Sequence, residues 1–142
     1  MKGIKAIYMI LIALLVLLLH ESAFSLEQDI DTNNNDRYTY IDRIGAKCTI
    51  SSGVATSSGT ITPKNHMRTS VTTRLQKSSD GVSGWTTIST WYGSSTGGTS
   101  VATGEKMLSS GYYYRTYVVG KVYDTSGSVV ETATKTTTNH YY

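Results

Sequence analysis

The chain of 142 residues has only one cysteine, one proline and one phenylalanine. A single cysteine excludes an internal disulfide, so the fold has to be stabilised by its core. Cys48 alternates with Ile44, Ala46 and Ile50, and this spacing predicts a small buried side chain, because a reactive thiol needs exposure and a lowered pKa. The scarcity of proline and phenylalanine leaves Thr, Val, Tyr and Ile to build the fold.

Long apolar runs are also missing, apart from residues 6–19, which follow two lysines. That run is shorter than the roughly 20 apolar residues of a membrane-spanning helix. Ala23 and Ser25 then place small side chains at the two positions that a signal peptidase must accommodate. We therefore expect residues 1–25 to be a cleaved secretory signal peptide, with an uncleaved anchor helix as the alternative. The mature protein is expected to be secreted or loosely associated with the cell surface, without a stable membrane anchor.

Residues 26–37 are acidic and rich in asparagine, which is typical of a flexible leader. Asp29, Asp31 and Asn33 have the spacing of a calcium loop, but the required glycine and bidentate carboxylate are missing, so we expect no metal and no cofactor. After residue 25 the chain has 11 basic and 9 acidic side chains. A net charge of +2 over this length is too small to predict a nucleic-acid partner.

Residues 38–142 have the composition of a β protein, with glycine or serine clusters at short intervals and no convincing helical period. The pattern predicts strands at 38–44, 44–50, 54–61, 71–76, 85–92, 99–108, 112–124 and 128–138. Seven or eight short strands in a domain of about 105 residues predict an all-β fold, an antiparallel immunoglobulin-like β-sandwich. A small closed barrel is the alternative.

Four segments of this domain carry a family resemblance. Ser70–Lys77 is an alternating strand that contains Leu-Gln, Gly84–Trp91 has a Trp-x-x-aliphatic pattern, and Ser110–Arg115 runs from Gly into Tyr-Arg, with Val-Val-Glu at 129–131. Together they resemble a family of uncharacterised small exported immunoglobulin-like β-sandwich proteins of Gram-positive bacteria. The resemblance implies an exported sandwich domain and carries over no catalytic or ligand residues.

Catalytic patterns are absent from the sequence. The two histidines after residue 25, His66 and His140, lie in polar surroundings, without a nucleophile elbow and with too few partners for a zinc site. Four carboxylates near turns form no recognisable acid and base pair: Asp80, Glu105, Asp124 and Glu131. We therefore expect that the protein is not an enzyme.

The segment 111–124 holds five tyrosines. The two-residue period of a strand places Tyr112, Tyr114, Val118 and Val122 on one face, predicted to be the core. Since lysine and arginine are rarely buried unpaired, the other face should point outward, and it is the candidate partner-binding face: Tyr113, Arg115, Tyr117, Lys121 and Tyr123. Two alternatives stay open. A tyrosine corner with a bulge would turn Tyr113 inward, or the tyrosines only cover the sheet.

The sequence thus predicts a secreted, non-catalytic β-sandwich that acts as an interaction module for an unknown extracellular protein or envelope component. A secreted effector or inhibitor would use the same surfaces. The alternative is a carbohydrate-binding module in which Trp85, Trp91 or the outward tyrosines stack on sugar rings. Against it, the two tryptophans are predicted to share one face of their strand, and Trp85 occupies a position that bacterial sandwiches often bury.

Overall fold

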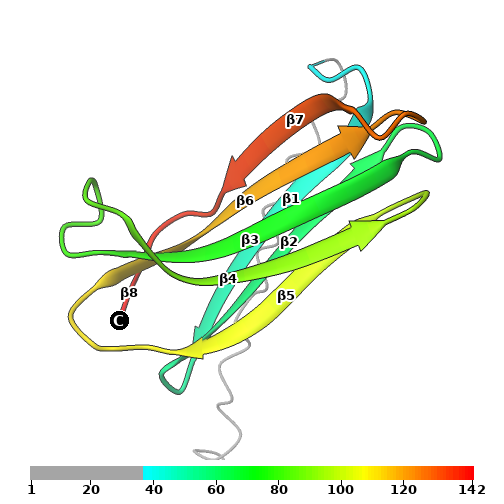
Figure 1. Ribbon diagram of the computed structural model, residues 1–142. Helices are drawn as coiled ribbons and strands as arrows, with labels where there is room; N and C mark the ends of the chain where they lie inside the picture. The colour runs from blue at the N-terminus through cyan, green and yellow to red at the C-terminus, as the bar shows by residue number, and fades with distance from the viewer. Residues whose placement is uncertain (1–36) are drawn as a thin grey trace, which may run out of the picture.

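The computed structural model describes residues 37–142, so the predicted signal peptide and leader residues 26–36 lie outside the described residues. Eight strands form the described chain, all paired antiparallel (Figure 1). Residues 37–142 contain no helix that could cross a membrane. The bounds are β1 Ile41–Ser51, β2 Val54–Pro63, β3 Arg68–Ser78, β4 Thr86–Ser95, β5 Ser100–Met107, β6 Tyr113–Tyr123, β7 Val129–Thr136 and β8 His140–Tyr141.

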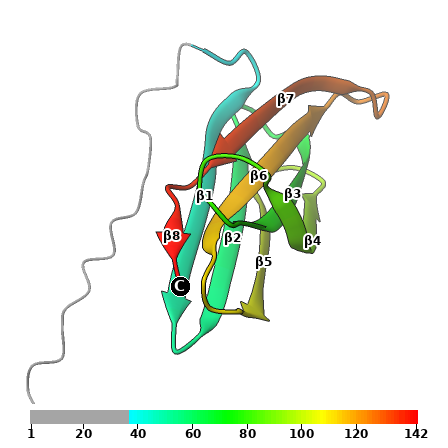
Figure 2. The same cartoon turned by 90° about the vertical axis from the view of Figure 1, so that its left-hand side faces the viewer.

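The strands form two sheets that pack face to face. The smaller sheet has the order β1-β2-β5 and the larger has the order β4-β3-β6-β7, with β8 paired to β6 beyond the end of β7. The edge strands β1 and β7 lie on the same side of the molecule (Figure 2). Neither sheet closes on itself, so the antiparallel β-sandwich is confirmed and the closed barrel is wrong.

The fourth strand decides the width of the larger sheet. In constant-type immunoglobulin domains the fourth strand joins the sheet of the first, second and fifth strands. Here β4 pairs with β3 along nine register positions, from Thr69 opposite Ser95 to Lys77 opposite Thr86. The chain then crosses to the smaller sheet between β4 and β5. The larger sheet is therefore four strands wide, and its outward side is the broadest regular surface of the described domain.

Two predicted strand boundaries are wrong. The strands expected at 38–44 and 44–50 are one strand, β1, whose register shifts between Ile41 and Arg43. The shift lets both Ile41 and Ile44 face the core, and they are 0% and 7% exposed. The strand expected at 128–138 ends at Thr136, after which Thr137 bonds to Thr116 through both its backbone N–H and its hydroxyl oxygen. The short strand β8, at His140–Tyr141, was not predicted.

A carboxylate fixes the beginning of β1. The two carboxylate oxygens of Glu131, on β7, accept hydrogen bonds from the backbone N–H groups of Thr39, Tyr40 and Ile41, each at 2.8 Å. Bonds of this kind to a charged acceptor contribute about 1.5–3 kcal/mol each in typical proteins. Glu131 therefore joins the edge of the larger sheet to the point where the chain enters the smaller one.

The core consists of two apolar clusters separated by a layer of small polar side chains. One cluster includes Val71 and Val118, and the other includes Leu75 and Tyr114. Along β3 the buried residue between the clusters is Thr73, and along β6 it is Thr116, both 0% exposed. Trp91 packs against both clusters. Within the described chain it is the side chain that connects them.

Buried hydroxyl groups link the two sheets through this interior. The Thr116 hydroxyl of β6 donates to the Ser57 hydroxyl of β2 at 2.9 Å. On β3, the Thr73 hydroxyl donates to the Ala102 carbonyl of β5 at 3.0 Å. The hydroxyls of Thr69 and Ser100, also on β3 and β5, lie 2.6 Å apart. No buried side-chain polar atom of residues 37–142 lacks a partner, so these groups are buried without the cost of an unmade hydrogen bond.

Two glycines allow the close contacts between the layers. A Cβ atom on Gly59 of β2 would lie 2.2 Å from Thr73 Oγ1 and under 3.0 Å from both methyl groups of Val118. A Cβ atom on Gly104 of β5 would lie 1.8 Å from Trp91 Nε1. The indole therefore lies directly on the backbone of β5 and closes the side of the sandwich between β4 and β5.

A tyrosine corner is present, but Tyr114 forms it and not Tyr113, the residue considered in the open alternative. The Tyr114 hydroxyl donates to the Ser109 carbonyl at 2.6 Å and accepts from the Ser109 N–H at 3.2 Å. This is the bond pattern of the corner that precedes the penultimate long strand of many sandwiches. The strand continues in unbroken register with β3 from Tyr113 onward. The bulge considered for this segment is therefore wrong, and Tyr113 stays on the outward face.

We expect Tyr114→Phe to lower the free energy of unfolding by about 1–3 kcal/mol, because both backbone groups of Ser109 lose their buried partner. Tyr113→Phe is the matched control, since the Tyr113 hydroxyl makes no hydrogen bond with residues 37–142. It should change stability by less than about 0.5 kcal/mol. Urea midpoints at unchanged slope measure both values. Equal losses in the two variants would contradict the corner at Tyr114.

Candidate interaction face

The candidate site is the outward side of the larger sheet, which we call the outer face. Cross-strand register aligns its rows from β4 across β3 and β6 to β7. The residues beneath it, such as Thr73, Val118 and Ala133, are 0–3% exposed, whereas those on it are half-buried or exposed. Its members are Trp85, Thr87, Thr90, Tyr92, Ser94, Arg68, Ser70, Thr72, Arg74, Gln76, Tyr113, Arg115, Tyr117, Val119, Lys121, Tyr123, Val129, Thr132, Thr134 and Thr136.

The predicted division of the tyrosine-rich strand is confirmed for its central residues. Tyr114, Val118 and Val122 are 0–1% exposed and belong to the core. Tyr112 is only half-buried and packs against the edge of the second cluster. On the other side, Lys121 is exposed, and the remaining four candidate residues are half-buried: Tyr113, Arg115, Tyr117 and Tyr123. Whether this side binds a partner stays a prediction.

Arg115 is held in place by two neighbours on the outer face. Its guanidinium carbon lies 3.9 Å from the centroid of the Trp85 ring. Its Nε–H donates to Gln76 Oε1 at 2.9 Å. Burial beside these groups lowers the pKa of Arg115, against a smaller opposite effect of Tyr117, but an arginine stays charged at any physiological pH. The cation is therefore fixed in position, and Nε–H is only one of the five N–H donors of its guanidinium group.

A second cation and ring pair lies at the opposite end of the face. The guanidinium carbon of Arg68 is 4.9 Å from the centroid of the Tyr123 ring. The Tyr123 hydroxyl lies 2.9 Å from the Ser70 hydroxyl on β3. Contacts of this type contribute about 0.5–1 kcal/mol at exposed sites. Together the two contacts hold the Tyr123 side chain in place, with Arg68 over its ring.

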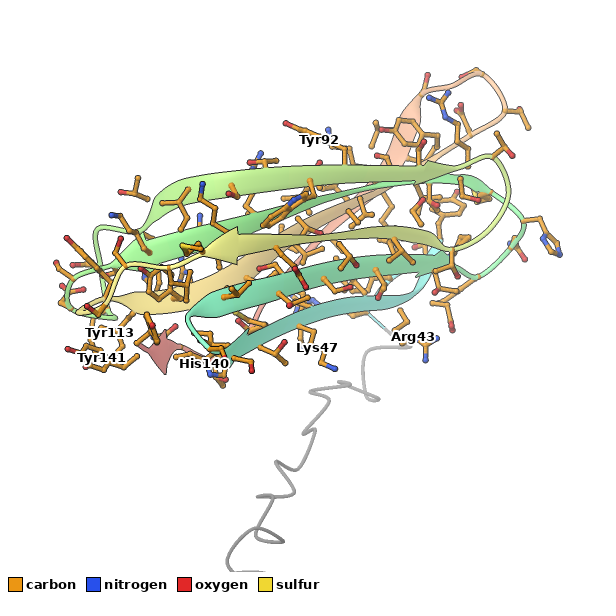
Figure 3. The ribbon with its side chains drawn as sticks, turned by 90° about the horizontal axis from the view of Figure 1, so that it is seen from below. Arg43, Lys47, Tyr92, Tyr113, His140 and Tyr141 are labelled. Carbon is orange, nitrogen blue, oxygen red and sulfur yellow. The ribbon has the colours of Figure 1, made fainter. Side chains whose placement is uncertain are left out.

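Tyr113 lies at the end of the sandwich where β8 pairs with β6, away from the centre of the face. Its ring lies 5.0 Å from that of Tyr141 on β8, and Figure 3 shows the two side chains together at this end. The loop between β3 and β4 covers it, since a Cβ atom on Gly81 would lie 2.8 Å from the Tyr113 ring. Of the five candidate residues, Tyr113 is thus the one with a packing role that accounts for its position.

The prediction that the two tryptophans share one face is wrong. The register of β4 against β3 shifts between Leu75 and Gln76, where Ile88 is the extra residue of a bulge. Ile88 packs against the second core cluster. Beyond the bulge the alternation is inverted, so Trp91 packs inward on the core while Trp85 lies under Arg115. Trp91 is therefore the core tryptophan of this domain.

Sequence reasoning missed three members of the face. Tyr92 is 78% exposed and projects away from the sandwich, on the side opposite Arg43 and Lys47 (Figure 3). It borders a shallow depression lined also by Ser70, Thr72 and Ser94. Arg68 and Arg74 join the face because β3 pairs with β6. The alternation of Val71, Thr73 and Leu75 is a signal that could have placed Arg74 outward, but nothing local shows which strand lies beside it.

In the described part of the chain, the residue types that bind metal ions are dispersed and the thiol is buried. In residues 37–142, no three side chains of the His, Cys, Asp and Glu types lie together so that they could hold a metal ion. Cys48 is 7% exposed, as predicted. Burial raises the pKa of its thiol, and hydrogen bonds with Thr116 and Ser57 oppose this effect. A thiol with a raised pKa in the interior is a poor nucleophile.

No protein-family model matches the chain, and a search of curated proteins finds no significant match. The resemblance to exported sandwich proteins of Gram-positive bacteria therefore stays a prediction.

Proposed function

We propose that the protein is an exported, non-catalytic interaction module, which binds an extracellular protein or a component of the cell envelope through the outer face. The observation that carries this proposal is the pair of arginines fixed on aromatic rings, Arg115 on Trp85 and Arg68 on Tyr123. Arginine and aromatic residues are enriched at interfaces. Side chains that are already held in place lose less entropy when a partner binds.

The centre of the face is open to a partner. Tyr92 is 78% exposed, and its neighbours across the sheet in the same row are Thr72, Val119 and Thr134. These side chains lie on four adjacent strands, so a partner would meet a continuous surface built on hydrogen-bonded backbone. Rigid elements position contact residues more accurately than loops do.

A second candidate function is binding of neutral carbohydrate. It is favoured by Tyr92, an exposed ring beside the hydroxyl groups of Ser70, Thr72 and Ser94. The two tryptophans support it less, because Trp91 is packed on the core and the guanidinium of Arg115 covers the Trp85 ring. Tyr92 is thus the residue on which this alternative depends.

Retention of the full-length secreted protein on the envelope fraction of its own cells tests the proposal. We expect Tyr92→Ser with Tyr117→Ser to reduce the retained fraction by a factor of roughly ten or more, the loss typical of hot-spot residues. The matched control is Val101→Ser with Met107→Ser on the smaller sheet, where the two side chains are 54% and 78% exposed. It should leave retention unchanged.

Equal retention of the two double variants, both with wild-type urea midpoints, would refute the role of the outer face. The carbohydrate alternative has its own readout. Tyr92→Ser alone should then abolish retention on an insoluble neutral polysaccharide such as cellulose or chitin.

A further inference from the structure

The described domain is considerably more basic than the whole chain. Residues 37–142 contain 11 Lys and Arg side chains and 5 Asp and Glu side chains, a net charge of +6. The outer face carries four of these cations, Arg68, Arg74, Arg115 and Lys121, and none of the five carboxylates. Its electrostatic potential is therefore positive over its whole length, which attracts anions.

Four of the five carboxylates in residues 37–142 form hydrogen bonds with groups that lie outside the outer face. Asp80 accepts from Val82, Ser83 and Ser78 in the β3–β4 loop, and Asp124 accepts from Ser126 and Ser128 in the β6–β7 turn. Hydrogen bonds from the Ser83 backbone and hydroxyl to Asp80, and from the Ser126 hydroxyl to Asp124, are the main causes that lower the pKa of each carboxyl. Glu131 binds the start of β1, and Glu105 lies beside Thr56 on the smaller sheet. These groups do not neutralise the outer face.

The four cations follow a line along β3 and β6. Lys121 is opposite Ser70 and Arg115 is opposite Gln76, so the cations correspond to positions 68, 70, 74 and 76 of β3. At about 3.3 Å per residue the line is roughly 26 Å long. Within residues 37–142 none of the four forms an ion pair. An extended anion could therefore contact all four at once.

We infer that the outer face binds an extended, hydroxyl-bearing polyanion of the polyol phosphate type, lying along β3 and β6. This inference rests on the proposed function and names the chemistry of its partner. Arginine guanidinium groups match phosphate oxygens with two parallel donors. The hydroxyl groups of Ser70, Thr72, Thr132 and Thr134 flank the line and suit a polymer that carries its own hydroxyl groups.

The same surface fits other polyanions less well. An anionic bilayer is bound by apolar side chains that enter it. The rows of the face hold two aliphatic side chains, the half-buried Val119 at the centre and Val129 beside Tyr123 at one end, and these are too few to form an apolar patch. Single-stranded nucleic acid stacks its bases on aromatic rings. Here Arg115 and Arg68 lie over the rings of Trp85 and Tyr123, which leaves Tyr92 as the well-exposed ring.

Binding of the full-length secreted protein to poly(glycerol phosphate) tests the inference, with dextran, linear polyphosphate, anionic phospholipid vesicles and single-stranded DNA as comparators. We expect binding to poly(glycerol phosphate) and none to dextran. For four phosphate contacts the affinity should fall on the order of 50-fold between 50 and 200 mM salt. Arg74→Gln with Lys121→Gln should weaken binding at least roughly tenfold.

Lys47→Gln with Lys106→Gln is the control, because it removes the same charge from exposed positions of the smaller sheet. It should weaken binding less than about threefold. Equal losses in the two double variants would overturn the inference, as would tighter binding to DNA, vesicles or polyphosphate. If the tyrosine variants lose envelope retention but poly(glycerol phosphate) does not bind, the proposed function stands and the inference fails. If poly(glycerol phosphate) does not bind and the tyrosine variants are retained on the envelope like the wild type, the proposed function and the inference both fail.

Discussion

Trp91→Ala is expected to lower the free energy of unfolding by about 3–5 kcal/mol, the usual cost of removing a packed tryptophan. The loss should reach this range although Trp91 is only half-buried, because its indole contacts both apolar clusters and lies on Gly104 of the other sheet. Without it the two clusters are connected only by the layer of hydroxyl groups. A loss of this size is a large fraction of the 5–15 kcal/mol typical of a domain.

Trp85→Ala is the matched control, since it removes the same side chain from the outer face. It should cost about 1 kcal/mol or less, mainly the contact with Arg115. Urea unfolding of both variants measures the difference. If Trp85→Ala were the more damaging change, the bulge at Ile88 and the inverted alternation beyond it would be wrong.

The second large effect is expected for Gly59→Ala. The added methyl group would lie 2.2 Å from Thr73 Oγ1 and 2.8 Å from a Val118 methyl group, both on the opposite sheet. Relieving this overlap requires Thr73 to move, which weakens its hydrogen bond to Ala102. Overpacking and the weakened bond together should cost about 3 kcal/mol.

Gly97→Ala provides the comparison in the loop between β4 and β5. The nearest atom to its new methyl group would be the carbonyl oxygen of His66, at 3.9 Å, which is an ordinary contact. This variant should unfold within about 0.5 kcal/mol of the wild type. A neutral Gly59→Ala, measured in the same urea titrations, would mean that the two sheets are further apart at β2 than the structure shows.

The alternation of residue types along β6 made it possible to predict from sequence which of its side chains face the core. Val118 and Val122 have the same parity as Tyr114, whereas Arg115 and Lys121 have the other parity, and a charged side chain is seldom buried without a partner. The position of the charged side chains was enough to decide which face of β6 is the core and which points outward. It did not identify the tyrosine corner, because three consecutive tyrosines can each supply the hydroxyl and only the preceding loop decides which one does.

The rest of the candidate face could not be predicted, for two physical reasons. The bulge in β4 adds one residue, so the residues beyond it point to the opposite face from the one that simple alternation predicts. Around Thr87 and Ser89 there are too few apolar side chains for the sequence to show this change of face. The pairing of β3 with β6 joins residues 35 to 55 positions apart, such as Arg74 and Tyr117. One sequence carries no local signal for such a pairing, so the row of cations appears only in three dimensions.

The hydroxyl groups that connect the two sheets also affect how stability depends on temperature. Apolar surface exposed on unfolding raises the heat capacity and polar surface lowers it, with a usual total of about 12–15 cal/mol/K per residue. An interior with Ser57, Thr73 and Thr116 at its centre exposes relatively more polar surface, so its heat-capacity increment should be smaller than usual. A smaller increment flattens the curve of free energy against temperature, and the domain is then less sensitive to both warming and cooling.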